Sequence, residues 1–540
     1  MKRIIRFTYS ILVLLLMCTT GCTKLDETSY SNVLAENYYN NKTEVTSVVL
    51  RPYTHIGASI GSWGGQKTYW RINELSADQL AIPQKGIHWY NNGDFVRLHG
   101  HTWTTVEDHT KIPFTLLYTG IGFCNNTIEE ISQLTTAKTG MTQAELDAAV
   151  AETKVLRAYQ YMKLMDLYGN IPIVTAVGTP LSPPTVPRAE VFKFIEAELK
   201  ENVEKLPPLS QSFVGRVTKA GGYAILAELY LNAELWSGTQ RWDDCISACD
   251  KIIGGQAGGL NGAPGLDADI KTAFSNTNDK SKEVLFSIAY DFVKTAYRAQ
   301  WNSDLWHYNQ KEVYDATHPG NSNNGIVVTP NAYDAYKNND LRKSTWMLIG
   351  PQFKFGTTTP VQGTQEYKGK PLVFVKEISR NSEGKTQSDM TQGEENSGAR
   401  FNKYLPGRTN DPNFWGNDWV LYRLTEIHFN KAEALIRKNG GVADATAVQL
   451  INDSKKRAFS ASDWLTEAYT PATLTLDELL AERGREFIFE GKRRTDLIRF
   501  GKFTTATWWD HQPTPKTREL FPIPYTQIAV NPNLVQNPGY

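Results

Sequence analysis

The sequence predicts a mainly α-helical protein, in which pairs of helices stack on one another and irregular loops lie along one side. Two observations lead to this prediction. Long segments in both halves of the chain carry apolar residues at helical spacing and on more than one side, as do helices packed between neighbours. The glycine- and asparagine-rich stretches between them hold many of the 14 Trp, 25 Tyr and 22 Phe residues.

The clearest single helix is expected over residues 142–168. Thr142 and Glu145 have the spacing of a capping box, and Gly169 follows the last apolar turn. Further helices are expected over 37–53, 113–134, 187–206, 218–236, 242–253, 420–438, 443–458 and 476–490. Residues 54–110 are expected to be rich in loops, and the long insert 254–419 to hold short strands at 284–289 and 372–378.

The composition is that of a globular protein and argues against nucleic-acid binding. Among 540 residues, Lys+Arg and Asp+Glu both number 57, so the basic surface that nucleic acids require is not expected. Beyond Leu16, no apolar run approaches transmembrane length. Cys245 and Cys249 lack further zinc ligands at a suitable spacing, so both are expected to be small, buried apolar side chains.

Residues 1–21 have the parts of a secretory signal: a basic start, a short apolar run that ends at Met17, and small residues before Cys22. The apolar run is too short to cross a bilayer core of roughly 30 Å as a helix. Its ending resembles the lipobox of bacterial lipoproteins, which implies that Cys22 becomes the lipid-bearing N-terminus. The alternative is ordinary signal cleavage nearby, with Cys22 as a free thiol.

Several motifs identify a family. The run AERGREFIFEGKRRTDLIRFG at 481–501, followed by PIP at 522–524, NPNL at 531–534 and QNPGY at 536–540, resembles the C-terminal half of SusD/RagB nutrient-binding lipoproteins. Upstream, LRAYQY at 156–161, LYGNIP at 167–172 and KAEAL at 431–435 resemble other motifs of that family. With the lipobox, the resemblance covers the chain from Cys22 to Tyr540.

The resemblance implies a scaffold of tetratricopeptide-like helix pairs with an irregular, loop-rich ligand-binding side. It divides the mature chain into an N-terminal half, 22–253, and a C-terminal half, 254–540. It further implies a lipoprotein anchored in the outer membrane and facing the cell exterior. Such a protein captures nutrient, usually a glycan, and delivers it to a SusC-like TonB-dependent transporter.

The aromatic residues are the candidate ligand contacts. A flat ring can cover the apolar C–H face of a sugar, while nearby Asp, Asn and Arg side chains bind its hydroxyl groups. Two stretches have this mixture, WYNNGD at 89–94 with a following arginine, and WNSDLW at 301–306. The predicted contacts are Trp89, Tyr90, Asp94, Arg97, Trp301 and Trp306, and less strongly Trp63 and Trp70. For each aromatic residue, packing within the protein is the alternative.

Other chemistry has less support in the sequence. The segment 57–61 fits G-x-S-x-G, but lacks the strand before it and the helix after it that a nucleophile elbow needs. His99, His101 and His109 form the densest histidine cluster, yet no complete metal-ligand set accompanies them. The charges between Glu482 and Asp496 are expected to form structural ion pairs, with Glu482 meeting the side chains at 485 or 486 and Glu490 meeting those at 493 or 494.

The sequence therefore predicts a binding protein with no catalytic residues, no metal and no cofactor. Its expected partners are a glycan, a SusC-like transporter and the outer membrane. Three alternatives remain open: a homologue that binds peptides or another nutrient, a surface glycoside hydrolase that uses two carboxylates, and a helical scaffold that binds only proteins.

Overall fold

The computed structural model describes residues 38–62, 67–178, 182–291, 301–316, 321–411 and 414–540. Its helices up to the insert are α2 (Lys42–Val49), α3 (Tyr53–Ser59), α4 (Tyr69–Leu75), α5 (Asp94–His99), α6 (Asp108–Ser132), α7 (Thr136–Thr139), α8 (Gln143–Tyr168), α9 (Arg188–Asn202), α10 (Lys219–Leu231), α11 (Ala233–Ser237) and α12 (Trp242–Ile253). The later helices are α13 (Asn302–Leu305), α14 (Lys311–Tyr314), α15 (Pro330–Asp334), α16 (Leu341–Trp346), α17 (Leu424–Lys438), α18 (Ala445–Lys455), α19 (Ala461–Glu467), α20 (Leu476–Phe487), α21 (Arg493–Arg499) and α22 (Tyr525–Ile528).

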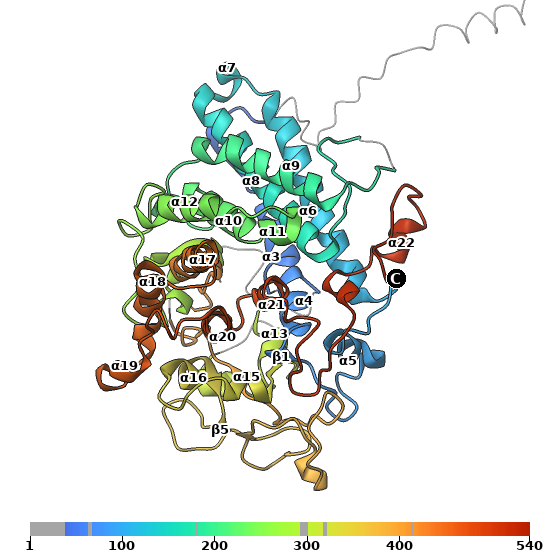
Figure 1. Ribbon diagram of the computed structural model, residues 1–540, viewed down its shortest axis with the longest axis vertical. Coiled ribbons are helices and arrows are strands. Elements are labelled where there is room, and N and C mark those ends of the chain that lie inside the picture. The colour runs from blue at the N-terminus through green and yellow to red at the C-terminus, as the bar shows by residue number, and fades with distance from the viewer. Residues whose placement is uncertain (1–37, 63–66, 179–181, 292–300, 317–320, 412–413) are drawn as a thin grey trace, which may run out of the picture.

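The predicted mainly helical class is confirmed. Helix α8 begins with the expected capping box, in which Thr142 and Glu145 exchange side-chain and backbone hydrogen bonds, and it ends at Gly169. It packs between α6 and α9, which explains why it is apolar on more than one side. Helices α10, α12, α17 and α18 pack in turn on one another, so the stack continues into the C-terminal half. These helices occupy the upper and left parts of Figure 1.

In the part of the chain that the structure describes, the strands are short and form two-stranded sheets. They are β1 (Leu80–Ala81) with β3 (Val327–Val328), β2 (Val284–Ile288) with β8 (Trp419–Arg423), β4 (Met347–Leu348) with β7 (Arg400–Phe401), and β5 (Gly350–Pro351) with β6 (Val373–Phe374), all antiparallel. With the surrounding loops and the short helices α15 and α16, several of them form the lower part of the molecule in Figure 1.

Several predicted boundaries are wrong; α6, for example, begins at Asp108 and not at residue 113, and β6 is limited to Val373–Phe374. Residues 419–423 form strand β8 and not the first turn of a helix, because they pair with β2 before α17 begins at Leu424. The segment 54–110 contains helices as well as loops. All seven residues of α4 are buried, so this helix shows no apolar stripe in the sequence, although its N-cap Thr68 accepts the hydrogen bond expected of a cap.

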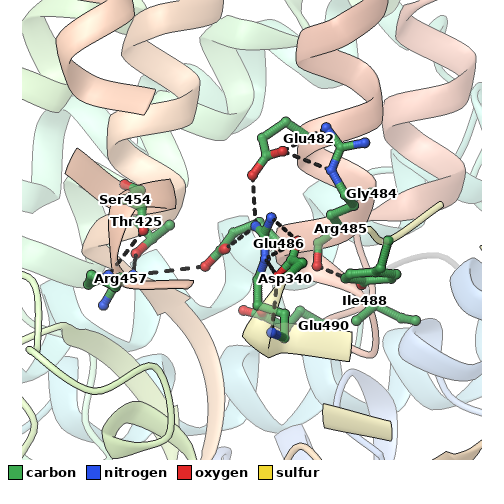
Figure 2. A network of polar contacts seen from close by, with 12 residues as sticks. Asp340, Thr425, Ser454, Arg457, Glu482, Gly484, Arg485, Glu486, Ile488 and Glu490 are labelled. Atoms are coloured by element: carbon green, nitrogen blue, oxygen red, sulfur yellow. Dashed lines mark hydrogen bonds and ion pairs between the residues drawn. The ribbon is translucent and has the colours of Figure 1, made fainter. Parts of the chain in front are cut away.

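A buried network of charges joins the C-terminal motif to the rest of the fold (Figure 2). The Arg342 guanidinium lies 2.7 Å from Glu482 and 2.9 Å from Glu486, and also binds Asp340. The Arg423 guanidinium contacts Glu486 as well, at 3.0 Å. These side chains are all almost fully buried, so each charge depends on its partners within the protein.

The local pairs expected along this motif are only partly present. Glu482 does pair with Arg485 at 2.7 Å. Glu490 instead pairs with Arg423 and Lys403, at 2.8 and 2.6 Å, and not with a residue one helical turn further on. The physical reason is that α20 ends at Phe487, so the residues after it do not continue the helical spacing.

Two further features agree with the sequence. Cys124, Cys245 and Cys249 are free and buried, and burial raises the pKa of Cys124 to about 12. In the described part of the chain, no helix is both long and apolar enough to cross a membrane.

Candidate functional site

The aromatic loop, defined here as residues 85–97, has an uncommon backbone conformation. Trp89, Asn91 and Asn92 have positive φ angles of 61°, 43° and 53°. Residues other than glycine seldom adopt this left-handed region, and asparagine is among those that tolerate it best. Such residues tend to gather at functional sites, where the surrounding structure holds them in place.

Trp89 fixes the middle of the aromatic loop to the segment 321–326, which follows α14. Its indole N–H donates a hydrogen bond of 2.9 Å to the carbonyl oxygen of Asn323. Its ring lies so close to Gly325 that a Cβ atom at that position would be 2.8 Å from it. Its other neighbour is Phe95, with the ring centroids 5.8 Å apart. The half-buried Trp89 is thus oriented by contacts on several sides.

Lys85 fixes the start of the same loop. Its ammonium group donates hydrogen bonds of 2.7 Å to the carbonyl oxygens of both Asn324 and Gly325. The side chain is buried, and this burial holds the pKa of Lys85 well below its usual value. Sequence reasoning missed this lysine and the segment that it binds, because the two lie about 240 residues apart and neither carries a motif.

Asp94 connects the aromatic loop to two basic side chains outside it. Its carboxylate lies 3.2 Å from the Lys67 ammonium and 3.1 Å from Nε2 of His109. Burial acts to raise the pKa of Asp94, but hydrogen bonding and charge from His109 and Lys67 outweigh it and lower the pKa to about 2. The carboxylate is therefore ionised at neutral pH and is bound by the protein's own groups.

Arg97 has a similar supporting position. Its guanidinium donates 2.7 Å and 2.6 Å hydrogen bonds to the Glu107 carboxylate and to the carbonyl oxygen of Asn92. The second bond holds one of the left-handed residues directly. Asp94 and Arg97, both predicted as ligand contacts, thus lie in the aromatic loop and stabilise its conformation.

The tip of the loop points into solvent. Tyr90 is 53% exposed and Ile87 is 89% exposed, and both asparagines that follow Tyr90 are exposed as well. An exposed phenol ring beside amide groups combines an apolar face with hydrogen-bond donors and acceptors. This is the arrangement that a hydroxyl-rich ligand with apolar C–H faces requires.

A second segment, 364–367, lies against the loop. Its backbone N–H groups donate hydrogen bonds of 2.5 to 3.3 Å to the buried carboxylate of Glu395. Burial acts to raise the pKa of Glu395, but these hydrogen bonds and one from His307 lower it to about 2. The Glu366 carboxylate comes within 3.4 Å of the place that a Cβ atom on Gly86 would take. The segment is thus held firmly where it adjoins the aromatic loop.

The other predicted tryptophans do not present a free face. Trp301 and Trp306 are 1% and 0% exposed, and their ring centroids lie 5.1 and 5.3 Å from that of Trp415. Trp70 is also buried, and its N–H donates a 2.8 Å hydrogen bond to the carbonyl oxygen of Phe489. The structure gives these three residues packing contacts, which the sequence did not distinguish from binding. Trp63 and the expected lipidation site Cys22 lie outside the described residues.

The weaker chemical motifs have structural explanations. Ser59 of the G-x-S-x-G match is buried within α3, where its hydroxyl contacts the Gln160 side chain, so it is not on a strand-to-helix elbow. The histidines have separate partners: His99 contacts Asp510 at 2.8 Å, and His101 contacts the Ser76 carbonyl oxygen at 2.8 Å. Within the described ranges, no group of three metal-binding side chains occurs.

Glu74 and Asp418 are carboxyl groups whose pKa is raised as far as a general acid at neutral pH requires, but neither is accessible. Burial raises the pKa of Glu74 to about 8 and that of Asp418 to about 7. Glu74 accepts a hydrogen bond from the Gly491 N–H, and Asp418 from the Tyr290 N–H. Both are nearly fully buried, so neither carboxyl group is placed to reach a substrate as one of the two acids of a glycosidase.

Two cavities lie away from the aromatic loop. An apolar groove of about 460 Å³ is lined by residues of α3, the 214–216 turn and the end of β2. A polar pocket of about 360 Å³ lies beside α18, α19 and α20. None of the predicted ligand residues lines either cavity, so the aromatic loop remains the candidate site on the basis of its exposed surface.

Family models match two parts of the chain. Residues 282–540 match the model described as SusD family, and residues 25–231 match the one described as starch-binding, associating with outer membrane. The starch-binding protein SusD of Bacteroides thetaiotaomicron is 26% identical over 516 residues, which cover 90% of this chain and 87% of that protein. SusD-like protein P2 of Formosa agariphila is 22% identical over 551 residues, 98% of each chain.

Solved structures show the same fold. A laminarin-binding SusD-like protein superposes with a TM-score of 0.69 at 20% identity, covering 93% of this chain and all of that one. Surface glycan-binding protein A from Bacteroides thetaiotaomicron, in complex with laminarihexaose, gives 0.68 at 20% identity, with 92% and 99% covered. At such identity the likeness establishes the fold of the chain and leaves its ligand to be argued from its own residues.

Proposed function

Since this chain belongs to the SusD/RagB family, we propose that it is a non-enzymatic lipoprotein that binds a glycan at the cell surface through its aromatic loop. The observation that carries the proposal is the exposed Tyr90 on a loop fixed by Lys85, Trp89 and Arg97. A surface that is already ordered loses little conformational entropy when it binds. Starch- and laminarin-binding relatives support a glycan as the ligand.

Delivery to a SusC-like TonB-dependent transporter is the second part of the proposal, and it rests on the family. The lipid on Cys22 would hold the protein at the outer membrane, facing outward, beside the transporter. The two family models span both halves of the chain, and one is described as associating with the outer membrane, which supports this location.

The direct test of binding is titration calorimetry of the purified mature chain against a panel of neutral and acidic glycans. Tyr90→Ala is expected to weaken binding about fivefold, since one aromatic contact contributes roughly 1 kcal/mol. Leu465→Ala is the control, because Leu465 is 83% exposed on α19, which carries none of the predicted ligand residues. Binding of peptides but no glycan would refute the ligand class, and release of reducing sugar would refute the non-enzymatic role.

The anchor is tested separately by Cys22→Ala. This variant is expected to bind the glycan with unchanged affinity in purified form, while cells that carry it lose uptake of that glycan. Mass spectrometry of the mature wild-type chain gives the lipid directly. Loss of binding in the purified variant would contradict the proposal that the anchor only localises the protein while the aromatic loop binds the glycan.

A further inference from the structure

A second pair of exposed aromatic side chains lies on a hairpin of the insert, residues 350–362. Strand β5 begins the hairpin, and the Lys354 N–H donates a 2.9 Å hydrogen bond to the Thr359 carbonyl oxygen. Phe353 pairs across the hairpin with Pro360. The hairpin lies in the lower part of the molecule, where Figure 1 labels β5.

The two faces of this hairpin differ. On the inner side, Val361 packs with Leu372 and Phe374 in a small core of its own, and all three are at most 1% exposed. On the outer side, Phe353 and Phe355 are 44% and 46% exposed. Both rings belong to residues 353–359, which include the turn at the tip of the hairpin and are all exposed.

Folding does not account for these exposed rings. Burying a phenylalanine side chain contributes roughly 1.5–3 kcal/mol, and a core lies directly beneath the hairpin, yet both rings remain outside it. Val373, which pairs with Pro351, adds a further 37% exposed apolar side chain. A contiguous apolar patch on an otherwise polar surface is typical of a recognition surface.

The surroundings of the rings favour a neutral, polar ligand. The Arg408 guanidinium lies over the Phe355 ring at 4.8 Å and is paired with Asp315 at 2.8 Å. Lys354 is paired with Glu312 at 3.0 Å. The two cations and two anions balance, so the rim offers hydrogen bonds without a net charge that would attract an ionic partner.

A short stretch of chain links the hairpin to the candidate site. The Asn309 side chain donates a 2.8 Å hydrogen bond to the carbonyl oxygen of Gln362, at the hairpin's end. Glu366, whose carboxylate adjoins Gly86 of the aromatic loop, lies six residues beyond Pro360 in the chain. Six residues span at most roughly 20 Å. An extended ligand of several sugar units is long enough to contact both surfaces.

We infer that Phe353 and Phe355 form a second carbohydrate-contacting platform, which binds sugar rings of a polymeric glycan whose neighbouring units occupy the aromatic loop. This inference rests on the proposed glycan-binding function and extends it to the length of the ligand. Two linked contacts on one polymer act at a high effective concentration, so the platform raises affinity for long chains and leaves short ones unaffected.

The test compares a polysaccharide with a short oligosaccharide of the same linkage, each titrated into the mature chain. The double variant Phe353→Ala/Phe355→Ala is expected to weaken binding of the polymer about tenfold and to leave the oligosaccharide within about twofold. Tyr90→Ala is expected to weaken both. Leu465→Ala, at an 83% exposed position on α19, is the matched control.

The outcomes separate the two proposals. If neither glycan binds the wild-type chain, the proposed function itself is refuted. If the polymer binds and the double variant leaves its affinity unchanged, the platform is refuted while the function stands. An equal loss for polymer and oligosaccharide also refutes it. Thermal unfolding checks the fold of the double variant, and the single changes Phe353→Ser and Phe355→Ser replace it if it unfolds.

Discussion

The charge network around α20 and the aromatic loop use similar residue types in opposite ways. In the network, Arg342, Glu482 and Glu486 are buried and satisfy one another within the protein. In the aromatic loop, charged side chains such as Arg97 bind the loop from within, while Tyr90 stays exposed. The comparison teaches that the charged side chains serve the fold in both regions, and that the exposed aromatic ring is what distinguishes the candidate site.

The largest expected effect comes from breaking the network at its centre. Arg342→Met leaves three buried carboxylates without their shared cation and is expected to destabilise the protein by about 3–5 kcal/mol. Urea unfolding followed by circular dichroism gives the change. Lys337→Met, which removes a largely exposed partner of Glu467, is the control, with an expected effect below about 1 kcal/mol. Similar losses of stability in the two variants would show that burial does not determine how much an ion pair contributes.

Acid is expected to weaken the support of the aromatic loop before it weakens the network. Burial lowers the pKa of His109 to about 4, although Asp94 acts to raise it, while Lys67 and Arg71 lower it further. In the unfolded chain the usual value near 6.5 applies, so the unfolded state takes up the proton first as the pH falls. The contribution of His109 to the free energy of unfolding is therefore fully present above pH 6.5. It decreases by about 3 kcal/mol as the pH falls to 4.

The measurement is the free energy of unfolding at several pH values between 7 and 4, for the wild type and for His109→Gln. The variant is expected to show a flatter dependence on pH. In the network, burial acts to raise the pKa of Glu482, but the guanidinium groups of Arg342 and Arg485 outweigh it and hold the pKa far below the usual value. This carboxylate therefore stays ionised over the same range. Parallel curves for wild type and variant would exclude His109 as the source of the slope.

The smallest effect on stability is expected at Lys85. This residue belongs to the aromatic loop, but its charge is buried and bound within the protein, as in the network. Lys85→Met leaves the carbonyl oxygens of Asn324 and Gly325 without their donor and is expected to cost about 1–3 kcal/mol. Because these carbonyls hold the segment beside Trp89, glycan affinity is expected to fall as well. Lys111→Met, at a half-exposed residue paired with Asp108, is the control. Unchanged affinity with lowered stability would show that the loop does not depend on this contact for binding.

Much of the fold was predictable because its causes are local. The capping box at Thr142, the glycine after α8 and the apolar spacing of α12 depend on residues within a few positions of one another. Helix α4 escaped prediction because a helix buried all round has no polar face to give a period. Strand β8 escaped it because its pairing partner β2 lies more than 130 residues earlier.

The sequence by itself determined the family, the helical class and the loop that carries Trp89 and Tyr90, because motifs, periodicity and composition are properties of neighbouring residues. Only the tertiary structure decided which aromatic rings remain exposed. Trp301 and Trp306 stand in as favourable a sequence context as Trp89 and Tyr90, yet they are enclosed by residues from distant segments such as Phe401, Tyr404 and Trp415. The exposure of a side chain depends on which distant segments pack around it, and the neighbouring sequence does not specify those segments.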